Sequence, residues 1–267
     1  MNQGDSHDMG LVGASVARVE NPSASGPFLI VCEHASNRFP PEFGTLGLDE
    51  AARRAHIAWD PGALGLARGL AKRLNAPLVA AQVSRLIYDL NRAPDAAGAM
   101  TARSETYDIP GNTGLTDKER RRRVEAVYLP FHADLHAEIV ARLARGLRPV
   151  IVTVHSFTPV YFGQLREVEF GIIHDADPAL AEAVLAEAVA RTDLDCRLNA
   201  PYSAADDVTH TLRLQATPYG LANVMLEIRN DLIADDGAEE AMAERLAPVL
   251  IAALTRITPP MSMEATA

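Results

Sequence analysis

The run Phe28-Leu-Ile-Val-Cys-Glu33 is short, apolar up to its last residue and partly β-branched, and the polar sequence His34-Ala-Ser-Asn37 follows it directly. A continuous apolar run of this length is typical of a strand that is buried on both faces, as in a parallel sheet. Similar runs predict further strands over residues 77–82, 150–155, 168–174 and 222–229.

Helical patterns separate these strands, over residues 49–56, 61–74, 116–145, 178–191 and 236–257. Thr116 and Glu119 form a capping-box signature at the start of the long third helix, and we expect Pro130 to kink that helix. Strands that alternate with helices indicate a layered α/β fold, with a largely parallel sheet and helices on both of its faces.

The chain has 267 residues, of which 48% are hydrophobic, and it shows no internal repeat and no Gly/Ser-rich or Pro-rich linker in its middle. A single domain over residues 27–257 is therefore expected. Residues 1–26 and 258–267 are small and polar without sustained periodicity, so we expect both to be flexible tails.

Composition excludes several classes of function. A net charge of −10 argues against nucleic-acid binding. The sequence has no signal peptide and no apolar run of about 18 residues, which predicts a cytoplasmic protein without membrane association. The two cysteines, Cys32 and Cys196, lie far apart and lack a CxxC partner, so a metal would need His and carboxylate ligands. Oligomeric state stays open.

Three predicted strands end in or contain a side chain suited to a metal site, namely His34, His155 and Glu227. In open α/β sheets ligands bind outside the carboxyl ends of the strands, so these positions could converge. A zinc hydrolase needs about three protein ligands, an open position for water and a nearby carboxylate as general base. His34, His155 and either Asp60 or Glu33 can supply the ligands, and Glu227 the base.

Each candidate also has a structural interpretation. Asp60 is well placed to cap the helix that follows it. Glu227 could pair with Arg229, because residues i and i+2 share a face of a strand. His132 and His136 share a helical face and imitate an i, i+4 zinc pair, although no Glu follows His132 as in the HExxH motif.

A second cluster contains Arg85, Asp89, Asn91 and Arg92. The planar fork of arginine binds a carboxylate bidentately, and an adjacent amide adds a donor, so the cluster suits an anionic substrate. Its structural alternative is an Arg–Asp pair at a strand end. The polar loop over residues 93–114 is of the kind that often covers a site.

Several motifs together resemble the N-formylglutamate amidohydrolase family, over roughly residues 28–255. They are Glu33-His34-Ala-Ser-Asn, Trp59-Asp60-Pro-Gly-Ala, Ser84-Arg85-Leu-Ile-Tyr-Asp-Leu-Asn91-Arg92, Tyr128-Leu-Pro-Phe-His132, Val154-His155-Ser-Phe-Thr-Pro and Leu226-Glu227-Ile-Arg229-Asn-Asp231. That family is related to the zinc carboxypeptidases and to the aspartoacylase and succinylglutamate desuccinylase group. The resemblance implies their three-layer α/β fold, also called phosphorylase/hydrolase-like, with a mixed, mostly parallel sheet flanked by helices.

The resemblance also implies one zinc ion, bound by His34 and His155. The carboxypeptidase relatives use an HxxE pair, whereas position 37 here is Asn, so the acidic ligand must come from elsewhere. Asp60 matches an acidic position of the formylglutamate group and is the expected third ligand, with Glu33 as the alternative.

The implied reaction is hydrolysis of N-formylglutamate, or of a similar small anionic N-acyl amino acid, as in histidine degradation. Glu227 then activates the water, Arg85 stabilises the oxyanion, and Asn91, Arg92 and Arg229 bind the substrate. Two alternatives stay open: a different N-acyl or γ-glutamyl substrate on the same site, and a non-catalytic zinc-binding or metabolite-binding protein.

Overall fold

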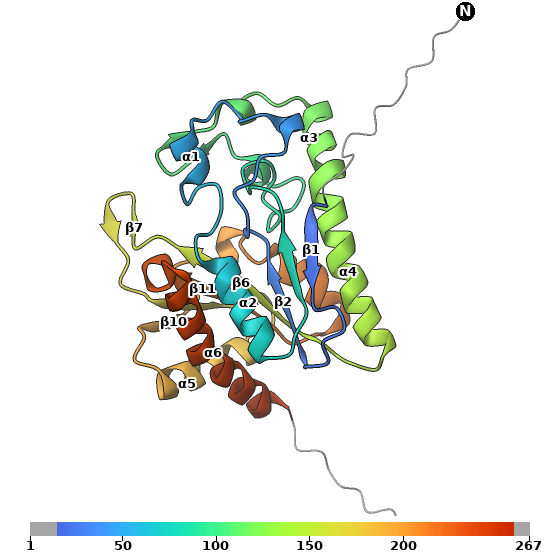
Figure 1. Cartoon of the computed structure of the whole chain (residues 1–267), viewed down its shortest axis with the longest axis vertical. Coiled ribbons are helices and arrows are strands. Elements are labelled where there is room, and N and C mark those ends of the chain that lie inside the picture. The colour runs from blue at the N-terminus through green and yellow to red at the C-terminus, as the bar shows by residue number, and fades with distance from the viewer. Residues whose placement is uncertain (1–14, 259–267) are drawn as a thin grey trace, which may run out of the picture.

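The computed structural model describes residues 15–258, which form a seven-stranded sheet with helices on both faces (Figure 1). The sheet order is β1-β3-β2-β6-β11-β9-β10. Its strands are β1 (Ala17–Glu20), β2 (Phe28–Cys32), β3 (Leu78–Ala81), β6 (Val150–Phe157), β9 (Phe170–Ile173), β10 (Cys196–Leu198) and β11 (Asn223–Arg229). The main helices are α1 (Glu50–Arg54), α2 (Ala63–Arg73), α3 (Asp117–Arg123), α4 (Leu129–Ala144), α5 (Ala179–Arg191) and α6 (Asp236–Ile257).

The sheet is mixed and mostly parallel, as expected. Strands β3, β2, β6 and β11 pair in parallel, whereas β1 runs antiparallel to β3 and β9 runs antiparallel to β11. The four parallel strands therefore direct their carboxyl ends to one edge of the sheet. In β6 and β11, His155 pairs in register with Glu227 and both side chains lie on the same face, which brings two distant candidates side by side.

Alternate residues of each strand enter different layers, which gives the fold two hydrophobic cores. In β2, Phe28 and Ile30 pack with helices α2, α5 and α6, while Leu29 and Val31 pack on the opposite side with α4. Figure 1 shows α2 and α6 on one side of the sheet and the long α4 on the other. This confirms the expected three-layer α/β class.

The capping box at Thr116 and Glu119 is present at the start of α3. A π-helical turn, Val124–Tyr128, then joins α3 to α4, and Leu129 N–H donates to Val124 O. Pro130 lies directly after this turn and has no N–H to donate, so the wider turn absorbs the irregularity that the sequence predicted as a kink.

Two expectations for the chain ends and the long loop need correction. Residues 17–20 are not part of a flexible tail, because β1 pairs with β3 along its whole length. Residues 1–14 and 259–267 lie outside the described residues. The loop over residues 93–114 contains short elements, η2 (Ala97–Met100), β4 (Arg103–Ser104), β5 (Tyr107–Asp108) and η3 (Pro110–Asn112).

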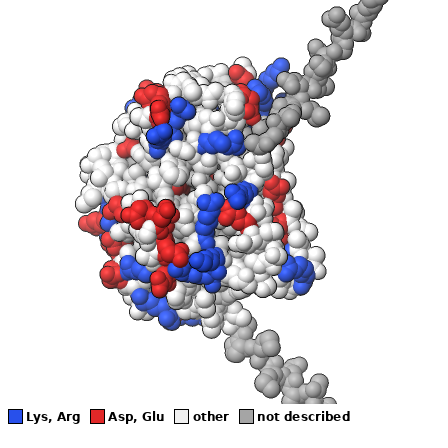
Figure 2. All heavy atoms as spheres, in the orientation of Figure 1, with Lys and Arg blue, Asp and Glu red and all other residues white. Residues whose placement is uncertain are grey.

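In the described part of the chain no helix is long and apolar enough to cross a membrane. On the face shown in Figure 2, basic and acidic side chains are intermingled.

Candidate active site

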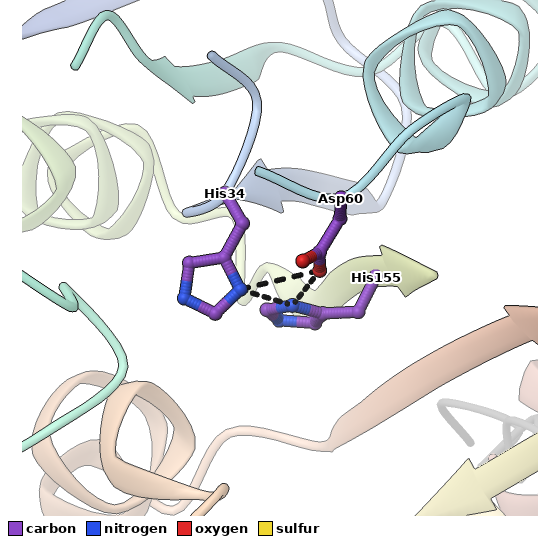
Figure 3. Close-up of side chains that lie close together, drawn as sticks. All are labelled: His34, Asp60 and His155. Atoms are coloured by element: carbon purple, nitrogen blue, oxygen red, sulfur yellow. Dashed lines mark hydrogen bonds and ion pairs between the residues drawn. The ribbon is translucent and has the colours of Figure 1, made fainter. Parts of the chain in front are cut away.

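His34, Asp60 and His155 converge at the carboxyl edge of the sheet and point toward one another (Figure 3). His34 follows β2, His155 lies near the end of β6, and Asp60 precedes α2. All three are buried. The structure thus brings together the three residues that the sequence nominated as metal ligands.

The donor atoms form a nearly regular triangle. Asp60 Oδ2 lies 3.2 Å from His34 Nδ1 and 3.0 Å from His155 Nδ1, and the two Nδ1 atoms are 3.1 Å apart. A tetrahedral zinc with bonds of about 2.0–2.1 Å separates its ligand atoms by roughly 3.3 Å, so these positions fit one such ion. Burial alone would raise the pKa of Asp60, but His34, His155 and Arg85 lower it. The carboxylate is therefore ionised and ready to bind a cation.

A carboxylate lies behind each imidazole. His34 Nε2 is 2.8 Å from Asp89 Oδ1, and His155 Nε2 is 3.3 Å from Glu33 Oε2. Because a carboxylate only accepts, it favours the tautomer with hydrogen on Nε2, which leaves the Nδ1 lone pair free for a metal. Glu33 thus lies on the opposite side of the His155 ring from the triangle, in the position of an orienting residue and not of a ligand.

The imidazoles and the carboxylates of the cluster shift the pKa values of one another. Burial lowers the pKa of His155, but Glu33 and Asp60 outweigh it and raise that pKa well above its ordinary value. Burial raises the pKa of Asp89, but Arg85 and His34 outweigh it and hold that pKa well below its ordinary range. The carboxylates of the cluster are therefore held ionised by Arg85 and the two imidazoles, and a divalent cation could take the place of the protons on those imidazoles.

Arg85 joins the two sides of the cluster. Its Nη1 donates to Asp60 Oδ1 at 3.1 Å, and its Nη2 and Nε donate to Asp89 Oδ2 at 2.6 and 3.2 Å. The ion pair between Arg85 and Asp89, which was the structural alternative for this cluster, is thus present. It lies within the site, where it fixes the acidic side chains around His34.

A tight turn presents Asp60 to the triangle. Gly62 has a φ of +79°, and a Cβ at this position would approach Ile233 O to 2.3 Å, so only glycine fits. Helix α2 starts at Ala63 without a side-chain cap. The interpretation of Asp60 as a helix cap is therefore wrong, because both its carboxylate oxygens are used by His34, His155 and Arg85.

Glu227 lies beside the triangle and is 4% exposed. Its Oε2 has no hydrogen-bond partner among residues 15–258. Burial raises the pKa of Glu227 to about 7, and Asp60 adds to this effect while His155 opposes it. Arg229 pairs instead with Asp231 and Glu169, so a structural Glu227–Arg229 pair is wrong. A carboxyl group with this pKa is suited to accept and return a proton near neutral pH.

The cluster opens into a cleft of about 740 Å³. The three residues that the sequence predicted to bind the substrate differ in their positions relative to this cleft. Asn91 lines the cleft, but its Nδ2 donates to Val208 O and its Oδ1 accepts from Thr211 N, so its amide holds the backbone. Arg92 lines the cleft with a buried Nη1 that has no partner in the described chain. Arg229 does not line it.

The loop over residues 93–114 contributes part of the cleft wall, as expected. Glu105 Oε1 accepts from Phe162 N at 3.0 Å, and Glu105 Oε2 lies 2.9 Å from His56 Nε2. Phe162 belongs to a hairpin of β7 (Val160–Tyr161) and β8 (Gln164–Leu165). The loop and this hairpin therefore touch across the mouth of the cleft, which suits a small substrate better than a polymer.

Sequence reasoning missed the roles of two residues of the site and the presence of two others. Asp89 was considered only as an arginine partner, and Glu33 only as a ligand. Arg166 and Tyr202, which also line the cleft, carry no motif that could have indicated them. His132 is not part of a zinc pair with His136, because its Nε2 donates to Leu90 O.

Comparison with known proteins supports the resemblance found in the sequence. The family model of N-formylglutamate amidohydrolase matches residues 26–234. An N-formylglutamate deformylase of Pseudomonas putida is 28% identical over 201 residues, which cover 69% of this chain and 74% of the relative. Among solved structures, a gene product of Agrobacterium tumefaciens is 51% identical with a TM-score of 0.89, covering 91% of this chain and 96% of its own.

An N-formylglutamate amidohydrolase of Ralstonia eutropha is 18% identical with a TM-score of 0.62, covering 91% and 99% of the two chains, and shares the fold. The motifs, the sheet and the family match over most of the chain agree with one another. The chain belongs to the N-formylglutamate amidohydrolase family.

Proposed function

We propose that this chain is an amidohydrolase that uses one zinc ion to cleave N-formylglutamate, or a similar N-acyl amino acid, to the free amino acid and a short carboxylic acid. The observation that carries the proposal is the buried triangle of His34, Asp60 and His155 with Glu227 beside it. The names of the relatives support the choice of acyl amino acid. A place in histidine degradation is part of the same proposal and rests on the family resemblance of the sequence alone.

His34, Asp60 and His155 would hold the metal. When bound, zinc would polarise the amide carbonyl and lower the pKa of water toward about 7. Asp89, through its hydrogen bond to Nε2 of His34, and Glu33, through its ion pair with Nε2 of His155, would keep the two imidazoles in the required tautomer and orientation. Loss of any ligand would leave an incomplete coordination shell.

Glu227 is the general base and then the general acid. Its carboxylate takes the proton of the attacking water, and the same proton passes to the amide nitrogen as the carbon–nitrogen bond breaks. A pKa of about 7 permits both steps near neutral pH. Arg92, whose Nη1 has no hydrogen-bond partner among residues 15–258, would bind the α-carboxylate. Arg85 borders the cleft and would stabilise developing negative charge, although its hydrogen bonds also hold Asp60 and Asp89.

Two features favour this reading over the alternatives. The contact of Glu105 with Phe162 joins the loop to the hairpin beside the cleft, which favours a small acyl amino acid over a longer γ-glutamyl peptide. Glu227 pairs in register with His155, which places a carboxyl group beside the metal ligands. A hydrolase requires such a general base, whereas a non-catalytic metal-binding protein does not.

The test is a hydrolysis screen with N-formyl, N-acetyl and N-succinyl glutamate on zinc-loaded protein. We expect the formyl compound to release formate and glutamate, and we expect Glu227→Gln to lower turnover by roughly 10²- to 10⁴-fold while it retains zinc. Turnover by the zinc-loaded variant equal to that of the wild type would remove Glu227 from the mechanism.

A further inference from the structure

Arg166 lies in the cleft wall, directly after β8. Its backbone is fixed on both sides. Its N–H donates to Pro159 O at 2.8 Å, and Arg229 Nη1 donates to its carbonyl at 3.4 Å and to Glu167 O at 3.1 Å. Arg229 therefore holds the backbone of the segment that contains Arg166. This structural role explains why Arg229 itself does not line the cleft.

Three aromatic rings surround the guanidinium of Arg166. Its Cζ lies 4.2 Å from the ring centroid of Tyr161, 5.1 Å from that of Tyr202 and 5.5 Å from that of Phe157. Stacking against ring faces orients the guanidinium plane but leaves its N–H groups free to donate at the edge. The rings thus fix the direction in which Arg166 offers its hydrogen bonds.

No carboxylate neutralises this cation in the described chain. None of the ion pairs among residues 15–258 includes Arg166, and its Nη1 is buried without a hydrogen-bond partner. A buried donor without a partner costs free energy unless a ligand or water satisfies it. Arg85, in contrast, is neutralised by Asp60 and Asp89, and Arg103 pairs with Asp108 at 3.0 Å.

Within the described residues, the cleft therefore has two guanidinium groups with a buried Nη1 that lacks a hydrogen-bond partner, those of Arg92 and Arg166. Arg92 precedes η2 (Ala97–Met100) and Arg166 follows β8 directly, so the two guanidinium groups come from different segments of the chain. Two separate cationic positions suit a substrate with two separate carboxylates.

We propose that Arg166 is a specificity-determining residue that binds the side-chain carboxylate of the substrate, while Arg92 binds its α-carboxylate. The inference rests on the proposed function for the orientation of the substrate. Tyr161 and Tyr202 position Arg166 without contacting the scissile amide. The site then selects acyl amino acids that have an acidic side chain.

The test compares N-formylglutamate with N-formylglutamine, which differ only in the charge and donor character of the side chain. We expect Arg166→Met to lower kcat/KM for N-formylglutamate by roughly 10- to 100-fold, mainly through KM, and to leave N-formylglutamine nearly unaffected. Arg103→Met is the matched control, because Arg103 also lines the cleft but is paired, and it should leave the ratio of the two substrates unchanged.

An equal loss on both substrates would show that Arg166 is structural, and no loss on either would exclude it from binding; both outcomes overturn the proposal. If Arg166→Met fails to fold, Arg166→Lys replaces it in the same comparison. We expect this variant to show a smaller loss of kcat/KM that is again confined to N-formylglutamate.

If the wild type hydrolyses neither compound, the proposed function fails, and calorimetry with L-glutamate and L-glutamine decides the role of Arg166. The proposal is supported if the wild type binds L-glutamate more tightly than L-glutamine and if Arg166→Met abolishes this preference. Equal binding of the two amino acids by the wild type overturns it.

Discussion

Replacement of Glu227 by glutamine is expected to stabilise the metal-free protein at neutral and alkaline pH, although it removes the general base. The side chain is 4% exposed, and burial raises its pKa to about 7 from the ordinary 4.5. Between these two pH values the folded protein binds more protons than the unfolded chain. The free energy of unfolding therefore falls as the pH rises through this window.

The size of the effect follows from the two pKa values. A difference between about 7 and 4.5 corresponds to roughly 3 kcal/mol once the pH exceeds both, because each pKa unit is worth about 1.4 kcal/mol. Glutamine keeps the shape and carries no charge at any pH. The advantage of Glu227→Gln should thus be small near pH 4.5, grow between pH 5 and 7, and level off near pH 8.

Urea unfolding of both proteins from pH 5 to 8.5, with chelator present, measures this difference. Glu182→Gln, at an exposed position of α5, is the control for loss of a surface carboxylate and should show no such trend. If the difference in unfolding free energy between Glu227→Gln and the wild type is the same at every pH, Glu227 is not a buried carboxyl with a raised pKa, and its assignment as a proton carrier loses its basis.

Three further substitutions probe the environment of the metal ligands. Asp60→Asn removes the anionic ligand and should weaken zinc binding, measured by chelator competition. We expect a loss greater than the roughly 10- to 100-fold that is typical of a residue that only orients a ligand. Unchanged zinc affinity with lower stability would instead show that Asp60 has a structural role. Glu33→Gln should weaken zinc binding within that 10- to 100-fold range, since Glu33 only orients His155; unchanged affinity would contradict this role. Asn91→Ala leaves the backbone at Val208 and at Thr211 unpaired and should cost about 1–3 kcal/mol in thermal unfolding; an unchanged melting temperature with a raised KM would instead make Asn91 a substrate ligand.

The four central parallel strands, β3, β2, β6 and β11, could be predicted because they are continuous apolar runs that both layers of helices bury. The same runs located His34, His155 and Glu227, since the carboxyl ends of parallel strands share one edge. Strands β1 and β10 could not be found in this way. Each has only three or four residues, mixes polar with apolar side chains, and depends on one neighbouring strand for its hydrogen bonds.

The cluster around the metal ligands was less accessible from the sequence than the ligands themselves. Glu33 is adjacent to His34 in sequence but lies behind His155 in space, which only the pairing of β2 with β6 decides. Arg166 depends on aromatic rings from separate segments of the chain, and no motif in the surrounding sequence marks it.

We propose that His34, Asp60 and His155 bind one zinc ion and that hydrolysis depends on this ion. Zinc titration of chelator-treated protein, with formate release from N-formylglutamate as the readout, tests it most directly. We expect turnover to rise in proportion to added zinc, to level off at one ion per chain, and to stay near zero in His155→Ala over the same range. Full turnover in the metal-free protein, or an equal response to zinc in His155→Ala, would contradict the claim.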